Sequence, residues 1–291
     1  MIALIRPAPP LRPYVICYAA ASARFENLEH HIVSARGVPM LMFPFKAPSD
    51  TGFLHGRDGS RYPSRMLDSP ALLTANSVFA QTYFQGQVNF VMVILQMTAA
   101  YHLLRCSVKG MANQVNLLDF YGLDPMFREL QERLWRAADS LAACQLIEQY
   151  LIRYFTRKHP PRLNGLEDAS RYLMTASAGR TDVGGLADQT GRSERWLQEQ
   201  FAHQTGLSPK SWLCLLRFRA AASYWVHHPG CSWLDLVERF GYTDQSHLIR
   251  EFRQYTGSAP VRHFSNHGRT EQMLHMNDPG LFGTSAEHPE I

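Results

Sequence analysis

The stretch TGRSERWLQEQFAHQTGLSP, Thr190 to Pro209, occurs a second time as FGYTDQSHLIREFRQYTGSAP, Phe240 to Pro260. The shared positions are two glycines, a leucine, a phenylalanine and a proline: Gly191 with Gly241, Leu197 with Leu248, Phe201 with Phe252, Gly206 with Gly257, and Pro209 with Pro260. The second copy has one extra residue between its first glycine and its leucine. A spacing that is repeated in this way indicates a duplicated supersecondary unit.

Each copy has the pattern of two short helices joined by a tight turn. A short amphipathic segment precedes the first glycine, which permits the turn. The leucine and the phenylalanine that follow are four residues apart and therefore lie on one face of a second helix. A Thr-Gly pair ends this helix in both copies. The pattern predicts a helix-turn-helix motif, in which the second helix enters the major groove of DNA.

The polar face of each second helix carries the side chains that are expected to contact DNA. They are Arg195, Gln198 and Glu199 in the first copy, and Gln245, Ser246, His247 and Arg250 in the second, with Arg253 one turn further as a phosphate contact. Arginine recognises guanine and glutamine recognises adenine through bidentate hydrogen bonds to the base edges. The simpler alternative is a solvated helix face, but two such helices in tandem favour DNA binding.

The repeated region resembles the DNA-binding domain of the AraC/XylS family of bacterial transcription regulators. The second copy carries the resemblance, in the run GYTDQSHLIREFRQYTGSAP, and the likeness covers roughly residues 165–265. It implies seven helices, with two helix-turn-helix units joined by a linker helix at about Pro209 to His227. It also implies that both recognition helices insert into successive major-groove segments on one face of DNA, through the residues named above.

The composition is typical of a soluble protein with folded domains of ordinary size. The chain has 291 residues, enough for two domains, and 45% of them are hydrophobic. Its five cysteines form no CxxC pair and no zinc-spaced group with histidine, so we expect reduced thiols, no metal and no cofactor. Proline interrupts the N-terminus too early for a signal peptide, and polar residues break the apolar run 88–104. We therefore expect a cytoplasmic protein without membrane contact.

The charge of the chain is unevenly distributed, with a net value of +4. Residues 162–270 contain 13 Lys and Arg against 10 Asp and Glu, whereas residues 271–291 contain four acidic residues and no basic one. This mild basicity argues against loose, purely electrostatic binding to DNA. It favours a site that uses a few well-placed arginines.

Residues up to about 107 are rich in short runs that favour β-strands. The runs are 14–20, 31–34, 38–45, 72–74, 80–84 and 89–96. The pair Asp58-Gly59 is the strongest short signal for a hairpin turn. Several short strands separated by turns predict a small sandwich or barrel, and a barrel of this size can hold one small ligand.

Two apolar stripes follow and predict helices. The first begins after Asp124-Pro125 and the second after Asp139-Ser140; their members are Phe127, Leu130 and Leu134, then Cys144, Ile147, Leu151 and Phe155. Such stripes are most often core within a domain. The alternative is a face that forms a homodimer.

The expected fold class is α+β, with a β-rich N-terminal part and an all-α C-terminal part. We expect a β-rich domain with C-terminal helices at residues 1–156 and a basic, proline-bearing linker at 157–164. A tandem helix-turn-helix domain follows at 165–265, and an acidic, flexible tail at 266–291.

The N-terminal domain resembles, more weakly, the effector domains of AraC/XylS regulators, through the run from Pro10 to Val15, PLRPYV. That resemblance implies a module that binds a small-molecule effector or forms a dimer. The aromatic residues that could line a pocket are His30, His31, Tyr83, Phe84, Phe90 and Tyr101, although aromatics at alternating positions are more often core. The identity of a ligand has no signal in the sequence.

The linker helix raises separate expectations. Ser208-Pro209 predicts its first turn, and Ser232 with Asp235 predicts a capping box for the helix after it. Arg217 and Arg219 are interpreted either as phosphate contacts or as members of surface ion pairs that contribute little to stability. Trp196, Trp212 and Trp225 are interpreted as packing residues.

Known enzyme motifs are absent from the sequence. It contains no P-loop, dinucleotide fingerprint, HExxH or GxSxG, and no cysteine has the setting of a repair alkyltransferase nucleophile, so we expect neither an enzyme nor catalytic residues. The preferred interpretation is a sequence-specific transcription regulator, an activator or a repressor, whose partners are double-stranded promoter or operator DNA and RNA polymerase. The alternative is a protein-interaction module, for example for RNA polymerase, with little affinity for DNA. The mild charge and Glu199 favour this alternative.

Overall fold

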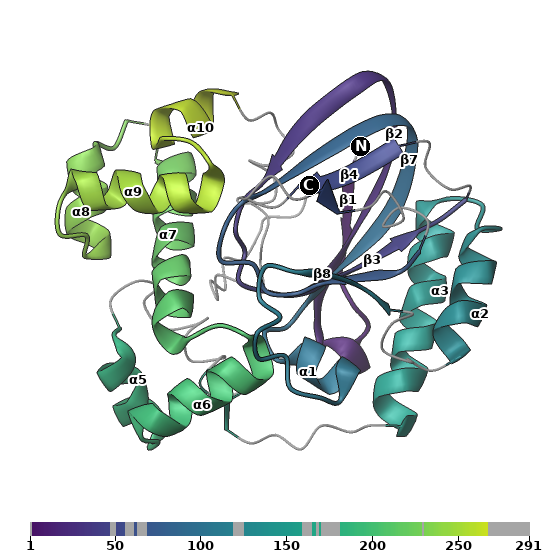
Figure 1. Ribbon diagram of the computed structural model, residues 1–291, viewed down its shortest axis with the longest axis horizontal. Coiled ribbons are helices and arrows are strands. Elements are labelled where there is room, and N and C mark those ends of the chain that lie inside the picture. The colour runs from purple at the N-terminus through teal and green to yellow at the C-terminus, as the bar shows by residue number, and fades with distance from the viewer. Residues whose placement is uncertain are drawn as a thin grey trace.

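An N-terminal antiparallel sheet with accompanying helices precedes a region built from helices (Figure 1). The computed structural model describes residues 2–46, 51–55, 61–62, 69–118, 125–158, 165–166, 169, 181–228 and 230–266. We call the described part of 2–158 the sheet region and the described part of 181–266 the helical region. The expected α+β class is confirmed.

The strands of the sheet region pair in the order β1-β2-β7-β3-β6-β8, and β4 pairs with both β7 and β5. Their bounds are β1 Ile2–Ile5, β2 Val15–Val33, β3 Met40–Pro44, β4 Thr51–His55, β5 Arg61–Tyr62, β6 Ala71–Leu73, β7 Ala80–Leu95 and β8 Val115–Leu117. All pairings among the described strands are antiparallel and belong to one sheet. Asp58-Gly59 lies outside the described residues, and the strands on either side of it, β4 and β5, pair with each other.

Two strands are much longer than the sequence indicates. The runs 14–20 and 31–34 belong largely to the single strand β2, and the runs 80–84 and 89–96 to β7. The expectation of separate short strands is therefore wrong here. The polar residues between the runs also belong to the β2–β7 pair. The register of this pair shifts between Phe25 and Glu29, as at a β-bulge.

The helices of the sheet region are η1 (Pro9–Leu11), α1 (Ala99–Leu104), α2 (Pro125–Leu134), α3 (Ser140–Ile152) and the π-helical turn η4 (Arg153–Lys158). Helices α2 and α3 lie side by side against the sheet, on the side away from the helical region (Figure 1). Both apolar stripes are buried in one core with the strands, so they are intradomain core and not a dimer face. Asp139 caps α3 as expected, whereas Asp124 and residues 159–164 lie outside the described residues.

The helical region contains α5 (Val183–Thr190), α6 (Glu194–Thr205), α7 (Pro209–His227), α8 (Trp233–Phe240), α9 (Gln245–Thr256) and α10 (Pro260–Asn266). Helix α7 has the bounds expected for the linker helix and runs between the α5–α6 pair and the α8–α9 pair (Figure 1). No described helix is both long and apolar enough to cross a membrane. The expected helix-turn-helix domain begins at residue 165, but residues 167–168 and 170–180 lie outside the described residues. The expected tail at 266–291 also lies outside them, apart from Asn266 at the end of α10.

Local chemistry explains where these helices begin and end. Gly191 and Gly241 end α5 and α8 in the left-handed conformation, with φ of 61° and 69°, which glycine adopts without strain. The extra residue of the second copy lies in the turn that follows Gly241, because α6 and α9 have equal lengths. The expected cap at Ser208 and the capping box of Ser232 and Asp235 are both confirmed.

Each helix-turn-helix unit has its own hydrophobic core, and α7 contributes to both. The core of the first unit contains Leu186, Leu197, Phe201, Trp212 and Leu216, together with Ala75 and Met97 of the sheet region. The core of the second unit contains Leu236, Leu248, Phe252, Leu215 and Phe218, together with Ala35 of the sheet region. The linker helix therefore joins the two units, and the sheet region packs into both.

Candidate nucleic-acid interface

Helix α6 presents one apolar face and one exposed polar face. Leu197 and Phe201 are fully buried, whereas Arg195, Gln198 and Glu199 are exposed. The Nε of Arg195 lies 3.1 Å from Oε1 of Glu199, with side chains that are 88% and 61% exposed. Solvent screens such a pair, so it holds Arg195 only weakly and leaves its guanidinium available to a partner.

Helix α9 repeats this arrangement. Its side chains Leu248 and Phe252 are fully buried, and the exposed set consists of Gln245, Ser246, Arg250 and Arg253. Asp244 caps the helix, because its carboxylate accepts the backbone N–H of His247 at 2.7 Å. The sequence-predicted contacts of this helix, apart from His247, thus share one solvent-facing surface.

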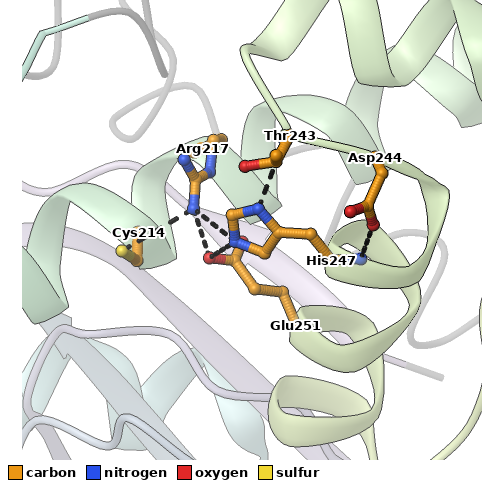
Figure 2. Close-up of polar contacts among 6 residues, drawn as sticks. All are labelled: Cys214, Arg217, Thr243, Asp244, His247 and Glu251. Atoms are coloured by element: carbon orange, nitrogen blue, oxygen red, sulfur yellow. Dashed lines mark hydrogen bonds and ion pairs between the residues drawn. The ribbon is translucent and has the colours of Figure 1, made fainter.

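His247 lies differently, because its ring is half-buried between α9 and α7 (Figure 2). Its Nδ1 accepts the backbone N–H of Thr243 at 3.4 Å. Its Nε2 lies 3.4 Å from Oε1 of Glu251 and 3.4 Å from Nη2 of Arg217. The ring is therefore held by protein groups at both nitrogens, and its contact with DNA stays a prediction.

An ion pair between Arg217 of α7 and Glu251 of α9 lies beside this ring (Figure 2). Only 16% of the arginine side chain and 9% of the glutamate side chain are exposed. The guanidinium carbon of Arg217 also lies 4.7 Å from the ring centroid of Tyr242. Burial, with the nearby Glu251 carboxylate as a second cause, raises the pKa of Tyr242, so its hydroxyl stays protonated. The cluster fastens the second recognition helix to the linker helix.

Neither arginine of the linker helix has the position that was expected from the sequence. Arg217 forms the buried pair with Glu251, and Arg219 is only 4% exposed. An Nη1–H of Arg219 donates to the carbonyl of Arg36 in the sheet region at 2.9 Å. The interpretation as surface ion pairs is therefore wrong for both residues, and the burial of Arg219 also contradicts a phosphate contact by that residue. The error arose because the sequence of α7 does not indicate which of its faces packs against other parts of the protein.

Glu251 was missed, although the sequence holds a signal for it. It lies three residues after Leu248 and four before Tyr255, so it falls on the apolar face of α9. A carboxylate on such a face needs a cationic partner from another element, because burying an unpaired charge is costly. Arg217 on α7 supplies that partner.

The aromatic residues that were considered for a ligand pocket do not form one group. Phe84 stacks on Phe90 with ring centroids 6.1 Å apart, and His30 stacks on Tyr83 at 4.8 Å. Tyr101 instead lies 5.1 Å from the ring of His203 on α6. The side chain of His31 is outside the described residues. Tyr101 therefore lies at the contact between the sheet region and the helical region.

The cysteines are free thiols in different places. Cys144 is buried in the core, where burial raises the pKa of its thiol to about 11, with the Glu148 carboxylate as a second cause. Cys106 is exposed. Among the described residues there is no group of three or more His, Cys, Asp and Glu that could hold a metal ion.

Comparisons with known proteins match the helical region to helix-turn-helix domains. A family model described as a helix-turn-helix domain matches residues 186–265. The HTH-type transcriptional regulator RipA of Corynebacterium glutamicum is 30% identical over 125 residues, which are 42% of this chain and 37% of RipA. The match thus spans little more than a third of the length of that relative.

Two solved structures are similar to parts of this one. ToxT from Vibrio cholerae O395 is 11% identical with a TM-score of 0.48, over 89% of this chain and 98% of that one. The DNA-binding domain of the transcriptional factor AdpA, in complex with a target DNA, is 23% identical with a TM-score of 0.32. That match covers 38% of this chain and 99% of the AdpA chain.

Proposed function

We propose that this chain is a transcription regulator of the AraC/XylS type, as its helix-turn-helix match and its similarity to RipA support, and that it binds DNA sequence-specifically with two recognition helices. Helices α6 and α9 would enter successive major-groove segments of one duplex. The observation that carries the proposal is the repeated pair of exposed polar faces, which contain Arg195, Gln198 and Glu199 in α6 and Gln245, Ser246, Arg250 and Arg253 in α9. Both helices share a buried leucine and phenylalanine and a glycine C-cap. Their arginine and glutamine side chains suit guanine and adenine edges.

The length of α7 is compatible with this proposal. Its 19 residues span about 28 Å at the usual rise per residue, against about 34 Å for one turn of duplex. Phe201 of α6 packs against Trp212 of α7, and Phe252 of α9 packs against Phe218, so the two recognition helices are attached to different turns of α7. In this arrangement Arg253 would contact phosphate, because it extends the polar face of α9 beyond Arg250.

The test of this function is selection of duplexes from a random-sequence library, followed by gel shifts of the selected and scrambled duplexes at several salt concentrations. A regulator enriches a defined sequence and binds it more tightly than the scrambled duplex at every salt concentration. A protein-interaction module with little DNA affinity enriches no sequence. That outcome would overturn the proposal and favour contact with RNA polymerase through the same helices.

We also propose that the sheet region regulates DNA binding, either by binding a small-molecule effector or by forming a homodimer. The proposed domains are residues 1–156 and 165–265, followed by an acidic tail, and the protein is proposed to be cytoplasmic. The packing of the sheet region into the cores of both helix-turn-helix units supports such coupling. A thermal-shift screen against small metabolites, with sedimentation of the full chain, tests both routes. A chain that stays monomeric on DNA and that no metabolite stabilises would contradict this regulation.

A further inference from the structure

The sheet region contacts the two recognition helices at equivalent positions of the repeat. In α6 the carbonyl of His203 accepts the backbone N–H of Val108 at 2.9 Å. In α9 the carbonyl of Gln254 accepts the backbone N–H of Phe79 at 3.4 Å. His203 and Gln254 both lie two residues after the buried phenylalanine that the two copies share. Two loops of the sheet region thus bind the same point of each repeated unit.

The glycines that end the two recognition helices lie against these same loops. A Cβ atom on Gly206 would meet the carbonyl oxygen of Val108 at 2.9 Å, and one on Gly257 would meet the ring of Phe79 at 3.0 Å. Gly191 also has a positive φ, but a Cβ there would meet no described atom within 4 Å. Of these three helix-ending glycines, Gly206 and Gly257 therefore lie close to the sheet region and Gly191 does not.

A third loop of the sheet region, residues 35–37, lies along α7 between the two units. The indole N–H of Trp212 donates to the carbonyl of Gly37 at 3.1 Å, and Arg219 donates to that of Arg36. The backbone N–H of Ala35 donates to the carbonyl of Tyr255 in α9 at 2.8 Å. Trp212 and Arg219 are almost fully buried, so these contacts are shielded from water.

These contacts leave the DNA-facing ends of both helices open. The loops bind α6 and α9 near their C-terminal ends, whereas Arg195, Gln245 and Ser246 lie at the N-terminal ends and are exposed. In helix-turn-helix proteins the N-terminal residues of the recognition helix contact the base edges. The docked sheet region therefore leaves these N-terminal residues of both helices open to solvent. Its effect falls on how the two helices are placed relative to each other.

We infer that the sheet region determines the spacing between the two half-sites on DNA, one for each recognition helix. It does so by fixing the separation and angle of α6 and α9. A unit packed on α7 alone has one attachment and can tilt about it. The loops at Val108 and at Phe79 give each unit a second attachment, so the relative placement of the two units becomes fixed. This inference rests on the proposed function, because spacing has a meaning only if both helices bind one duplex.

The test uses the full chain and a duplex that the wild-type chain selects from a random library. The two half-sites of this duplex are mapped, and variants are made with one or two base pairs inserted or deleted between them. Affinities of the wild type, Gly206→Ala, Gly257→Ala and the control Gly191→Ala are measured on every spacing. The control carries the same strain from a positive φ, without the contact to the sheet region.

The wild type and Gly191→Ala should prefer the selected spacing over the altered ones by at least about tenfold, which corresponds to about 1.4 kcal/mol. Gly206→Ala and Gly257→Ala should bind single half-sites normally and lose most of that preference. Unchanged spacing preference in both variants would overturn the inference. Tighter binding by both variants at every spacing would also overturn it, because the docked state would then be inhibitory. A wild type that selects no sequence would instead overturn the proposed function.

A second variant keeps the test valid if alanine at the glycines prevents folding. Phe79→Ala removes the ring beside Gly257 without changing the helical region, and Phe84→Ala is the matched control, since its ring stacks on Phe25 and Phe90 within the sheet region. Phe79→Ala should broaden the spacing preference and speed hydrogen exchange of the Ala35 amide. Equal spacing preferences for the two phenylalanine variants would contradict the inference.

Discussion

The unit of α5 and α6 and the unit of α8 and α9 end their recognition helices with the same bonds. Thr205 and Thr256 each donate a hydroxyl to the carbonyl of the phenylalanine four residues earlier, both at 2.7 Å. The residue before that phenylalanine differs. Gln200 accepts from Gln204 within its own helix at 3.0 Å, whereas Glu251 pairs with Arg217 of the linker helix.

This difference shows that the residues that fold each unit are not the residues that hold its recognition helix against α7. The repeated leucine, phenylalanine and glycine positions produce the same motif twice, whatever polar residues lie between them. The second recognition helix has in addition a buried charge pair to α7, and the first has none at the equivalent position. We therefore expect α9 to be held more firmly than α6 and to depend more on a single side chain.

The largest effect should come from Glu251→Ala. Removing one partner of a buried ion pair leaves the other charge unpaired, which should lower the free energy of unfolding by about 3 kcal/mol. The matched change Gln200→Ala in α6 removes a neutral hydrogen bond and should cost about 1 kcal/mol. Urea denaturation of the full chain, followed by circular dichroism, measures both values.

A double variant separates the charge pair from simple packing. Arg217→Met combined with Glu251→Met removes both charges and should recover most of the stability that Glu251→Ala loses. A double variant as unstable as Glu251→Ala would show that the ion pair is not the cause. Equal losses for Glu251→Ala and Gln200→Ala would contradict the asymmetry between the units.

Arg250→Ala should weaken specific DNA binding by about 1–3 kcal/mol, because the exposed arginine of α9 would lose its contact with a base edge. The measurement is a titration of the selected duplex against a scrambled duplex. Affinity for the scrambled duplex should change much less. Unchanged affinity for the selected duplex would count against a base contact by this residue.

Arg253→Ala should weaken binding to every sequence alike. Loss of one phosphate contact should reduce the slope of log affinity against log salt by about 1. Salt titrations on the selected and scrambled duplexes measure this slope. A loss confined to one base pair would mean that Arg253 contacts a base edge and not the backbone.

Glu199→Ala should have the smallest effect. Its pair with Arg195 is exposed and screened, so stability should change by less than about 1 kcal/mol. Binding to duplexes of any sequence should tighten slightly, because a carboxylate facing phosphates is removed. Loss of discrimination at a single cytosine would instead assign Glu199 a direct base contact.

The helical region could be predicted from sequence because its signals are local. A glycine that must adopt a positive φ, a leucine and a phenylalanine four residues apart, and serine caps at Ser208 and Ser232 each indicate their structure within a few residues. The family resemblance then assigned a role to α7. The exposure of Arg195, Gln245 and Arg250 follows from the same periodicity, and their contacts with DNA stay predictions.

The remaining features depend on partners that are distant in the sequence. Strands β2 and β7 are continuous because each is the other's partner, and a polar segment such as the one near Glu26 gives no sign of that pairing. Arg219 is buried because the carbonyl of Arg36, 183 positions away, accepts its hydrogen bond. Phe79 and Val108 approach the repeat from loops that carry no motif.

Methylation interference on the selected duplex tests the central claim most directly, because a methyl group on guanine N7 blocks contacts in the major groove. The two-helix account predicts two groups of interfering guanines, centred about one helical turn apart on the same face of the duplex. Arg250→Ala should abolish interference in one group and Arg195→Ala in the other. A single group of interfering guanines, or two groups on opposite faces of the duplex, would contradict the account.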